Sequence, residues 1–266
     1  MSNDPEIVAQ VLSPDQNAAG FLQDAPDPLR YEGDRPFDAD EVTGIVADMI
    51  PSGARVLDVG CGSGLLGRMF ADKCHAEVVG IEPDPVRAER AMARGLEVHV
   101  GYLTPDIIPE IGSFDIVLFA DVLEHLPNPQ ALLLVSRGAL KQQGAVIVSV
   151  PNVAHWSVRL SLLCGRFQHQ EWGIMDATHL RWFTAESIRS LIDSSGFKVV
   201  GYRATAGRGL SDNDGRVPLR WLPANYRTRF LRVASRRWPT LFGAQHVLKA
   251  EVVWNPAGIP AQYANR

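Results

Sequence analysis

Hydrophobic residues along the middle of the chain gather in short unbroken runs, and each run is followed by a polar turn or a stretch with helical spacing. Five such runs have the length and the Val and Ile content of buried strands; they cover residues 54–60, 77–83, 97–103, 114–120 and 145–151. The spacing of apolar residues between them predicts helices at 65–73, 85–94 and 129–140. Continuous apolar strands that alternate with helices indicate a parallel sheet covered on both faces.

Two further helices flank this alternation. The first begins near Phe37, where Asp38 or Asp40 is its candidate cap, and the second begins at the candidate cap Thr184. The last two predicted strands cover residues 197–204 and 246–254. We therefore predict an α/β fold: a doubly wound (Rossmann-like) mixed seven-stranded sheet with an amphipathic helical insert before the last strand.

Two long segments interrupt the alternation after the fifth strand. Residues 152–183 contain three Trp and three His, and connections of this length in compact domains are often lids or binding loops. Residues 208–243 form a basic helical insert. We expect one cofactor-binding domain over 37–266 that contains this lid segment (152–183) and this basic insert (208–243). The polar, Pro-rich residues 1–36 are expected to form a flexible lead-in.

The overall composition is that of a globular chain, with 46% hydrophobic and 21% charged residues and a net charge of −4. Disordered, collagen-like and membrane-spanning classes are excluded on these values. The net charge conceals an asymmetry, because residues 1–214 carry 17 basic and 29 acidic side chains, whereas residues 215–266 carry nine basic and one acidic. The C-terminal part is therefore a separate electrostatic surface.

The cysteines and the N-terminal residues point to a cytoplasmic protein. Three cysteines without metal-ligand spacing fit a reducing compartment better than a disulfide framework. The first residues lack the basic and apolar regions of a signal peptide, and no apolar run reaches the roughly 20 residues needed to cross a bilayer. Any membrane contact is expected to be peripheral.

The basic insert has the pattern of an amphipathic helix. Tyr226, Phe230 and Val233 recur at helical spacing, with arginines on the remaining faces. Residues 216–240 could thus contact the inner face of a membrane, with arginines for anionic head groups and aromatic rings for the acyl boundary. Alternatively, the stripe packs on the sheet while the arginines are solvated or pair with acidic residues. Nucleic-acid binding is the least favoured reading, because the cofactor domain is acidic.

The most informative window is VLDVGCGSGLLG at 56–67. Glycines allow a tight turn between strand and helix that a cofactor can approach closely, a pattern shared by nicotinamide and other adenosyl cofactors. Asp58, at the end of the strand, would repel a pyrophosphate but attract an ammonium or sulfonium. Glu82 ends the second strand, where it can accept hydrogen bonds from ribose hydroxyls. These residues favour a cationic adenosyl cofactor over NAD and over a simple strand-to-helix turn.

These motifs carry a family resemblance. VLDVGCGSG, the downstream IEP and FDIVLFADVLEHLPNP resemble the class I S-adenosylmethionine-dependent methyltransferases. The resemblance implies S-adenosyl-L-methionine as cofactor, with the methionine part at the glycine turn, the ribose at the end of the second strand, and the sulfonium near the end of the fourth. Adenine would meet the Tyr102 ring and the Leu103 backbone, since the acid that often follows the third strand in this family is missing. The implied contacts are Asp58, Gly60, Cys61, Gly62, Gly64, Glu82, Pro83, Tyr102, Leu103, Ala120 and Asp121.

The chain also resembles ubiquinone-type O-methyltransferases and enzymes that methylate sugars of bacterial surface polysaccharides. Three shorter stretches carry this resemblance: DPLRY (27–31), DVLEHLPNP (121–129) and ATHLRWFT (177–184). The resemblance implies that Arg30 reaches the methionine carboxylate and that Tyr31 closes over the cofactor; a surface pair is the alternative.

We therefore expect O-methylation of a small polar acceptor, such as a sugar of a surface glycan or a lipid-linked intermediate, with a quinol as the alternative. An NAD-dependent oxidoreductase and a non-catalytic adenosyl-binding protein are the competing classes.

A histidine is the natural base for an oxygen acceptor, because its pKa lies near neutrality. His179 is the first candidate, with Asp176 to orient its ring; the alternative is that both residues simply fasten the lid segment. His125 is the second candidate. Asp121, Glu124 and His125 could share one face of a helical turn, which the resemblance to some ubiquinone-type enzymes would allow to hold a divalent ion. A helix N-terminus with favourable acids is the preferred reading, so no metal ligand is predicted.

Overall fold

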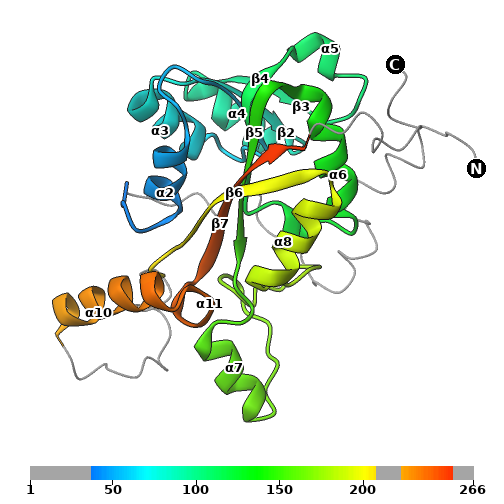
Figure 1. The fold of residues 1–266 in the computed structure, drawn as a ribbon. Helices are drawn as coiled ribbons and strands as arrows, with labels where there is room; N and C mark the ends of the chain where they lie inside the picture. The colour runs from blue at the N-terminus through cyan, green and yellow to red at the C-terminus, as the bar shows by residue number, and fades with distance from the viewer. Residues whose placement is uncertain (1–36, 208–222, 254–266) are drawn as a thin grey trace, which may run out of the picture.

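The apolar runs form a seven-stranded sheet in the computed structural model, which describes residues 37–207 and 223–253 (Figure 1). The strands lie in the order β3-β2-β1-β4-β5-β7-β6. Strands β1 to β5 are mutually parallel, and β7 runs antiparallel to both β5 and β6. Their bounds are β1 Arg55–Val59, β2 Glu77–Glu82, β3 Glu97–Val100, β4 Phe114–Ala120, β5 Leu140–Pro151, β6 Phe197–Ala204 and β7 Gln245–Val252. The predicted doubly wound, mixed seven-stranded sheet is confirmed.

Helices cover both faces of the sheet and enclose two hydrophobic clusters (Figure 1). One face is covered by α2 (Val42–Met49), α3 (Leu65–Cys74) and α4 (Pro85–Ala93), and the other by α5 (Ile108–Ile111), α6 (Pro129–Ser136) and α8 (Ala185–Ser194). The central strands are buried on both faces, as in β4, where the residues from Ile116 to Phe119 are almost fully inaccessible. Burial on both faces explains why these strands read as unbroken apolar runs.

The structure confirms one predicted helix cap and corrects another. Thr184 precedes α8, and its hydroxyl accepts the backbone N–H of Ser187 at 3.1 Å in a capping box. At α2, in contrast, the N-cap residue is Glu41, so the predicted cap at Asp38 or Asp40 is wrong. Asp40 turns instead toward the arginines of the basic insert. Sequence could not reveal this, because the partner helix comes nearly 200 residues later.

The carboxyl ends of the parallel strands carry the segments of irregular structure. A 3-10 turn, η2 (Leu123–His125), follows β4, and α7 (Trp156–Leu163) follows β5 within the lid segment. In the basic insert, α10 (Ala224–Arg237) and α11 (Pro239–Phe242) lead into β7. Figure 1 shows α7 and the α10–α11 pair projecting from the same end of the sheet. This edge is where ligands bind in doubly wound folds.

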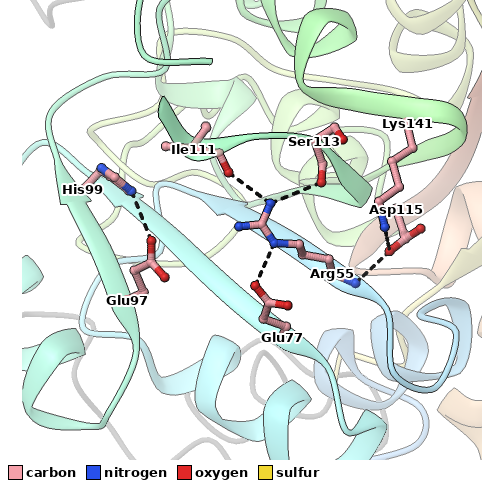
Figure 2. Close-up of polar contacts among 8 residues, drawn as sticks. All are labelled: Arg55, Glu77, Glu97, His99, Ile111, Ser113, Asp115 and Lys141. Carbon is pink, nitrogen blue, oxygen red and sulfur yellow. Dashed lines mark hydrogen bonds and ion pairs between the residues drawn. The ribbon is translucent and has the colours of Figure 1, made fainter. Parts of the chain in front are cut away.

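The opposite, amino-terminal edge of the sheet is held by a polar network around Arg55 (Figure 2). The guanidinium donates to the backbone oxygens of Ile111 and Ser113 at 3.0 and 3.2 Å and to Glu77 Oε1 at 2.7 Å. It also lies over the Phe114 ring, 4.5 Å from the centroid. These contacts join β1 and β2 to the segment that enters β4.

Some expectations concern residues outside the described ranges. Arg30, Tyr31 and the whole lead-in at 1–36 lie there, as does the first part of the basic insert, 208–222. Within the described ranges, every helix is too short or too polar to cross a bilayer. The limits of the single domain over 37–266 remain a prediction.

Candidate active site

The glycine turn after β1 has the backbone geometry that the sequence implied. Gly60, Gly62 and Gly64 have φ values of 72°, 56° and 77°, in the left-handed region that side chains with a Cβ disfavour. The N–H groups of Gly60 and Cys61 donate to Ile81 O at 2.7 and 3.2 Å, which ties the turn to the end of β2. Gly64 is the N-cap of α3 and makes no side-chain cap. The turn therefore presents the positive end of a helix to the carboxyl edge.

The turn also rests on close packing that leaves no room for larger residues. A Cβ on Gly80 of β2 would lie 2.5 Å from Cys61 Sγ, and one on Gly60 would lie 2.8 Å from Val122 Cγ2. The pKa of the Cys61 thiol is far above its usual range. Burial is the main cause, and the negative charges of Asp58 and Glu82 raise the pKa further. Cys61 thus acts as a buried apolar spacer beneath the turn.

Glu82 is fixed at the end of β2. It is 2% exposed, and its carboxylate accepts the N–H of Gly62 at 2.8 Å and the N–H of Asp84 at 3.0 Å, one on each oxygen. Each carboxylate oxygen has a second lone pair for a ligand hydroxyl. Tyr102 lies just beyond β3, and the pKa of its hydroxyl is raised by burial and then by the charge of Glu82.

Asp58 lies below the turn with an unsatisfied carboxylate. It is 2% exposed, and its Oδ2 has no hydrogen-bond partner among the residues that the structure describes. Burial, and then the negative charge of Glu82, raise its pKa from 3.8 to about 7. A cation beside this carboxylate would reverse both effects. Asp58 and Glu82 together therefore form an acidic floor beneath the glycine turn.

Asp121, directly after β4, is held in a strained conformation. Its φ of 57° is unusual for a residue with a side chain. Its Oδ1 accepts hydrogen bonds from Ser149 Oγ at 2.8 Å and Gln245 Nε2 at 2.7 Å, and its N–H lies 3.1 Å from Ser149 Oγ. Neighbouring Ala120 is half-buried. Sequence reasoning missed Ser149 and Gln245, because their contacts depend on how β5 pairs with β4 and how β7 pairs with β5.

The structure brings the two candidate bases together. His125 lies in η2 and His179 in the lid segment, yet their ring centroids are 4.9 Å apart in an edge-to-face arrangement. His125 Nδ1 lies 3.2 Å from Thr178 O, and His179 Nδ1 lies 3.2 Å from Ile174 O. A carbonyl oxygen only accepts, so each Nδ1 carries a proton and Nε2 is the basic nitrogen of the neutral ring. Burial is the main cause that lowers the pKa of His125, and electrostatic repulsion from the nearby His179 ring is the second.

Glu124 completes this cluster, although sequence reasoning gave it no catalytic role. It is 1% exposed, and neither carboxylate oxygen has a hydrogen-bond partner among the described residues. Burial, then the charge of Asp121, raise its pKa well above the usual value. Its backbone oxygen accepts the N–H groups of Leu180 and Arg181 at 2.8 and 2.9 Å, which fastens the lid segment onto η2.

Asp176 shapes the turn that presents His179. Its Oδ1 accepts the N–H and the hydroxyl of Thr178 at 2.8 and 2.7 Å, and its backbone oxygen accepts the N–H of His179 at 3.1 Å. Its proposed role in orienting the imidazole remains a prediction.

The lid segment around this turn is rich in aromatic contacts. The His169 ring is stacked on Trp182 with centroids 5.9 Å apart, and Phe167 meets Trp182 edge to face. A small apolar cluster of Val158, Ile174 and Met175 packs beneath. The lid segment thus has its own core and carries His179 on an ordered support.

Comparisons with known proteins identify the family of the chain. The family model described as a methyltransferase domain matches residues 34–202, more than half of the chain. A ubiquinone biosynthesis O-methyltransferase of Xanthomonas axonopodis pv. citri (strain 306) is 37% identical over 114 residues, which cover 41% of this chain and 47% of that protein. A protein of the same name from Ruegeria sp. (strain TM1040) is 31% identical over 156 residues, covering 56% and 62%. The chain spans about half the length of the curated relatives it matches.

Solved structures share the fold. A SAM-dependent methyltransferase from Archaeoglobus fulgidus is 16% identical with a TM-score of 0.51, covering 93% of this chain and 100% of that one. A Burkholderia thailandensis 1,6-didemethyltoxoflavin-N1-methyltransferase, solved with 1,6-didemethyltoxoflavin and S-adenosylhomocysteine, is 18% identical with a TM-score of 0.52, covering 95% and 92%.

Proposed function

Because the chain belongs to the S-adenosylmethionine-dependent methyltransferase family, we propose that it transfers the methyl group of S-adenosylmethionine to an oxygen atom of a small polar acceptor. The leading acceptor class is a sugar of a surface glycan or a lipid-linked intermediate. The alternative is a quinol, which the name of the curated relatives favours. The proposal concerns the domain formed by residues 37–207 and 223–253 and the carboxyl edge of its sheet.

The acidic floor is the observation that carries the cofactor assignment. Asp58 and Glu82 are both 2% exposed and interact through space beneath the glycine turn. A pyrophosphate placed against two buried carboxylates would be repelled, whereas the ammonium or sulfonium of S-adenosylmethionine would be attracted. Glu82 can accept from the ribose hydroxyls while it holds the backbone of Gly62. This favours the methyl donor over NAD.

For methyl transfer the protein has to position the acceptor oxygen and to accept one proton from it. The acceptor oxygen attacks the methyl carbon in line, the carbon–sulfur bond breaks, and sulfur keeps the electron pair, which gives S-adenosylhomocysteine. The hydroxyl proton passes to an imidazole. We assign this role first to Nε2 of His179 and second to His125, since the Nδ1 contacts fix Nε2 as the basic atom in both rings.

Cofactor binding and product formation test the proposal directly. Titration calorimetry of the full chain is expected to show binding of S-adenosylmethionine and none of NAD. Incubation with methyl-labelled cofactor and candidate extracts, followed by mass spectrometry, should show S-adenosylhomocysteine and a labelled product in a glycan, lipid-linked or quinone fraction. Binding of the cofactor without any labelled product would instead favour a non-catalytic adenosyl-binding protein.

Substitution of the first base candidate separates binding from chemistry. His179→Gln is expected to lower turnover by roughly 10²- to 10⁴-fold, the usual contribution of a general base, with little change in cofactor affinity. His169→Gln, on the same lid segment but stacked on Trp182, is the matched control and should retain turnover. Equal turnover in both variants would remove His179 from the reaction.

The exposed face of α10 supports a peripheral membrane contact. Tyr226, Phe230 and Val233 are 61%, 44% and 58% exposed, so the apolar stripe faces outward, while Ser235 on the opposite face of the helix is buried. Arg229 and Arg237 are exposed beside it. Such a face suits an anionic bilayer surface. Flotation with phosphatidylglycerol vesicles is expected to fall sharply in a Phe230→Ser, Val233→Ser double variant; unchanged flotation, or binding to nucleic acid instead, would contradict this contact.

A further inference from the structure

The end of α4 packs directly against the glycine turn. A Cβ on Gly64 would lie 2.7 Å from Ala91 Cβ and 2.8 Å from Leu96 Cδ1. Ala91 and Leu96 are both buried, so this side of the turn is sealed by side chains. A cofactor must therefore approach the turn from the other side, and the end of α4 is the support behind it.

Arg94 adds a polar contact to this packing. It is the half-buried C-cap residue of α4, and its Nη1 donates a hydrogen bond to Ser63 O at 2.7 Å. Its backbone N–H donates to Arg90 O and Ala91 O at 3.2 and 3.1 Å, which anchors it to the helix. Hydrogen bonds from a charged donor are shorter and stronger than those between neutral groups. Ser63 O is therefore held by a strong donor on a fixed support.

The peptide between Ser63 and Gly64 needs such a support. A flip of this peptide changes ψ of Ser63 and φ of Gly64, and glycine adopts either sign of φ about equally readily. In the structure φ of Gly64 is 77°. The oxygen and the N–H of a trans peptide point in opposite directions, so Arg94 holds the oxygen while the Gly64 N–H donates to Cys61 O at 3.0 Å within the turn. Both contacts would be lost in the flipped peptide.

Arg94 acts on the half of the turn that leads into α3. The first half is held from β2 through backbone N–H groups, as where Gly62 donates to the Glu82 carboxylate at 2.8 Å. The second half ends at Gly64, the N-cap of α3. The N–H groups at a helix N-terminus attract negative charge, such as the carboxylate of a methionine group. The direction in which this half presents its N–H groups therefore depends on how the Ser63 carbonyl is held.

We propose that Arg94 is a positioning residue for the methionine end of the cofactor: through Ser63 O it keeps the Ser63–Gly64 peptide in the orientation that the cofactor binds. This role rests on the proposed function, in which the methionine part lies at the glycine turn. Without Arg94, only a fraction of the molecules would hold the correct peptide orientation, and the apparent affinity would fall by that fraction. The adenosine end, at the ends of β2 and β3, would be unaffected.

Two ligands that differ only at the methionine end test this role. S-adenosylhomocysteine carries the amino acid group, whereas methylthioadenosine has a methyl group in its place. Titration calorimetry of full-length Arg94→Met is expected to show roughly 10-fold weaker binding of S-adenosylhomocysteine, the scale of one charge-assisted hydrogen bond. Affinity for methylthioadenosine should be unchanged. Arg94→Lys should restore binding to within about 3-fold of the parent, since a single donor suffices at Ser63 O.

Arg68→Met is the matched control. Arg68 lies on the neighbouring α3, where its Nε donates to Asp72 Oδ2 at 3.2 Å, and its loss should leave the affinity for both ligands unchanged. Chemical denaturation without ligand verifies the fold of each variant, and Arg94→Gln replaces Arg94→Met if the latter does not fold.

The outcomes separate the role of Arg94 from the cofactor assignment. Equal weakening of both ligands, unchanged binding of S-adenosylhomocysteine in the folded variant, or failure of lysine to restore it would overturn the positioning role while the cofactor assignment stands. If the parent chain bound neither ligand, the cofactor assignment itself would be wrong, and the role of Arg94 with it.

Discussion

The charge of the buried Asp58 carboxyl depends on pH and, in the proposed site, on the binding of a cationic cofactor beside it. Its pKa of about 7 in the cofactor-free fold lies above the ordinary 3.8, so the folded state keeps a proton that the unfolded chain loses as pH rises. Between these two values, stability falls with increasing pH, by on the order of 4 kcal/mol in total. A cationic ligand restores the balance by favouring the ionised form.

This linkage gives a prediction for Asp58→Asn. Without cofactor, the unfolding temperature of the variant should decline less between pH 5 and pH 8 than that of the parent, because the ionisable group is gone. Cofactor affinity of the parent should rise as pH increases through about 7, and the variant should bind weakly at every pH. Thermal unfolding and calorimetry across pH measure both; a parent affinity that falls with pH would contradict the role of the carboxylate.

At the scale of residues, the sequence predicted which acids gather at the carboxyl ends of the strands better than it predicted how the candidate catalytic histidines meet. Asp58, Glu82 and Asp121 each end an apolar run, and parallel strands bring such ends to one edge, so their proximity follows from pattern alone. The meeting of His125 with His179, and the isolation of Glu124 beside them, depend on how the lid segment folds over η2. No periodicity encodes that contact.

At the scale of elements, Asp40 fastens α10 to the domain. Arg236 Nη2 donates to Asp40 Oδ1 at 2.9 Å, and Arg232 Nε lies 2.5 Å from Oδ2 without the alignment of a hydrogen bond. The Asp40 side chain is 8% exposed, so this pairing is less screened than a surface ion pair. The sequence alternative in which arginines pair with acidic residues therefore holds for two of them, while the apolar stripe faces outward.

We predict that Asp40→Asn loosens α10 without disturbing the cofactor edge. Trypsin cleavage within 227–237 should accelerate by roughly 10-fold, equivalent to about 1.4 kcal/mol of local stability, with cofactor affinity unchanged. Asp48→Asn is the matched control, since Asp48 pairs with Arg203 on the exposed surface at 2.7 Å. Equal cleavage of the two variants would show that Asp40 does not hold the helix.

Element types were predictable where one face or both faces are buried. The strands and the longer helices follow their apolar pattern, and Thr184 marks the start of α8. The short α5, η2 and α11 have too few residues to show a period. The start of α2 was misplaced because Asp40 is used for a tertiary contact, which outweighs its local preference for capping.

At the scale of the whole molecule, the two edges of the sheet have separate tasks. Arg55 holds the amino edge through contacts with the backbone carbonyls of Ile111 and Ser113 (Figure 2) and with the Phe114 ring, and it begins β1, whereas the glycine turn follows the end of that strand. Arg55→Met is expected to lower the free energy of unfolding by about 1–3 kcal/mol while cofactor affinity stays the same. Chemical denaturation and calorimetry measure the two quantities.

Lys141→Ala is the matched control at the same edge. Lys141 and Asp115 form an ion pair with 44% and 38% exposed side chains, so its loss should cost no more than about 1 kcal/mol. Weaker cofactor binding in Arg55→Met would show instead that the two edges are coupled through the strands.

The position of β7 between β5 and β6 also dictates an order of events on the ribosome. β6 touches the sheet only through β7, yet it leaves the exit tunnel some 40 residues earlier. The five parallel strands can pair during synthesis, and α8 can pack on α6, whereas β6 can join the sheet only after β7 has emerged. Until then the outer edge of β5 is open to other strands, so a nascent chain stalled within the basic insert is the form that needs chaperone protection.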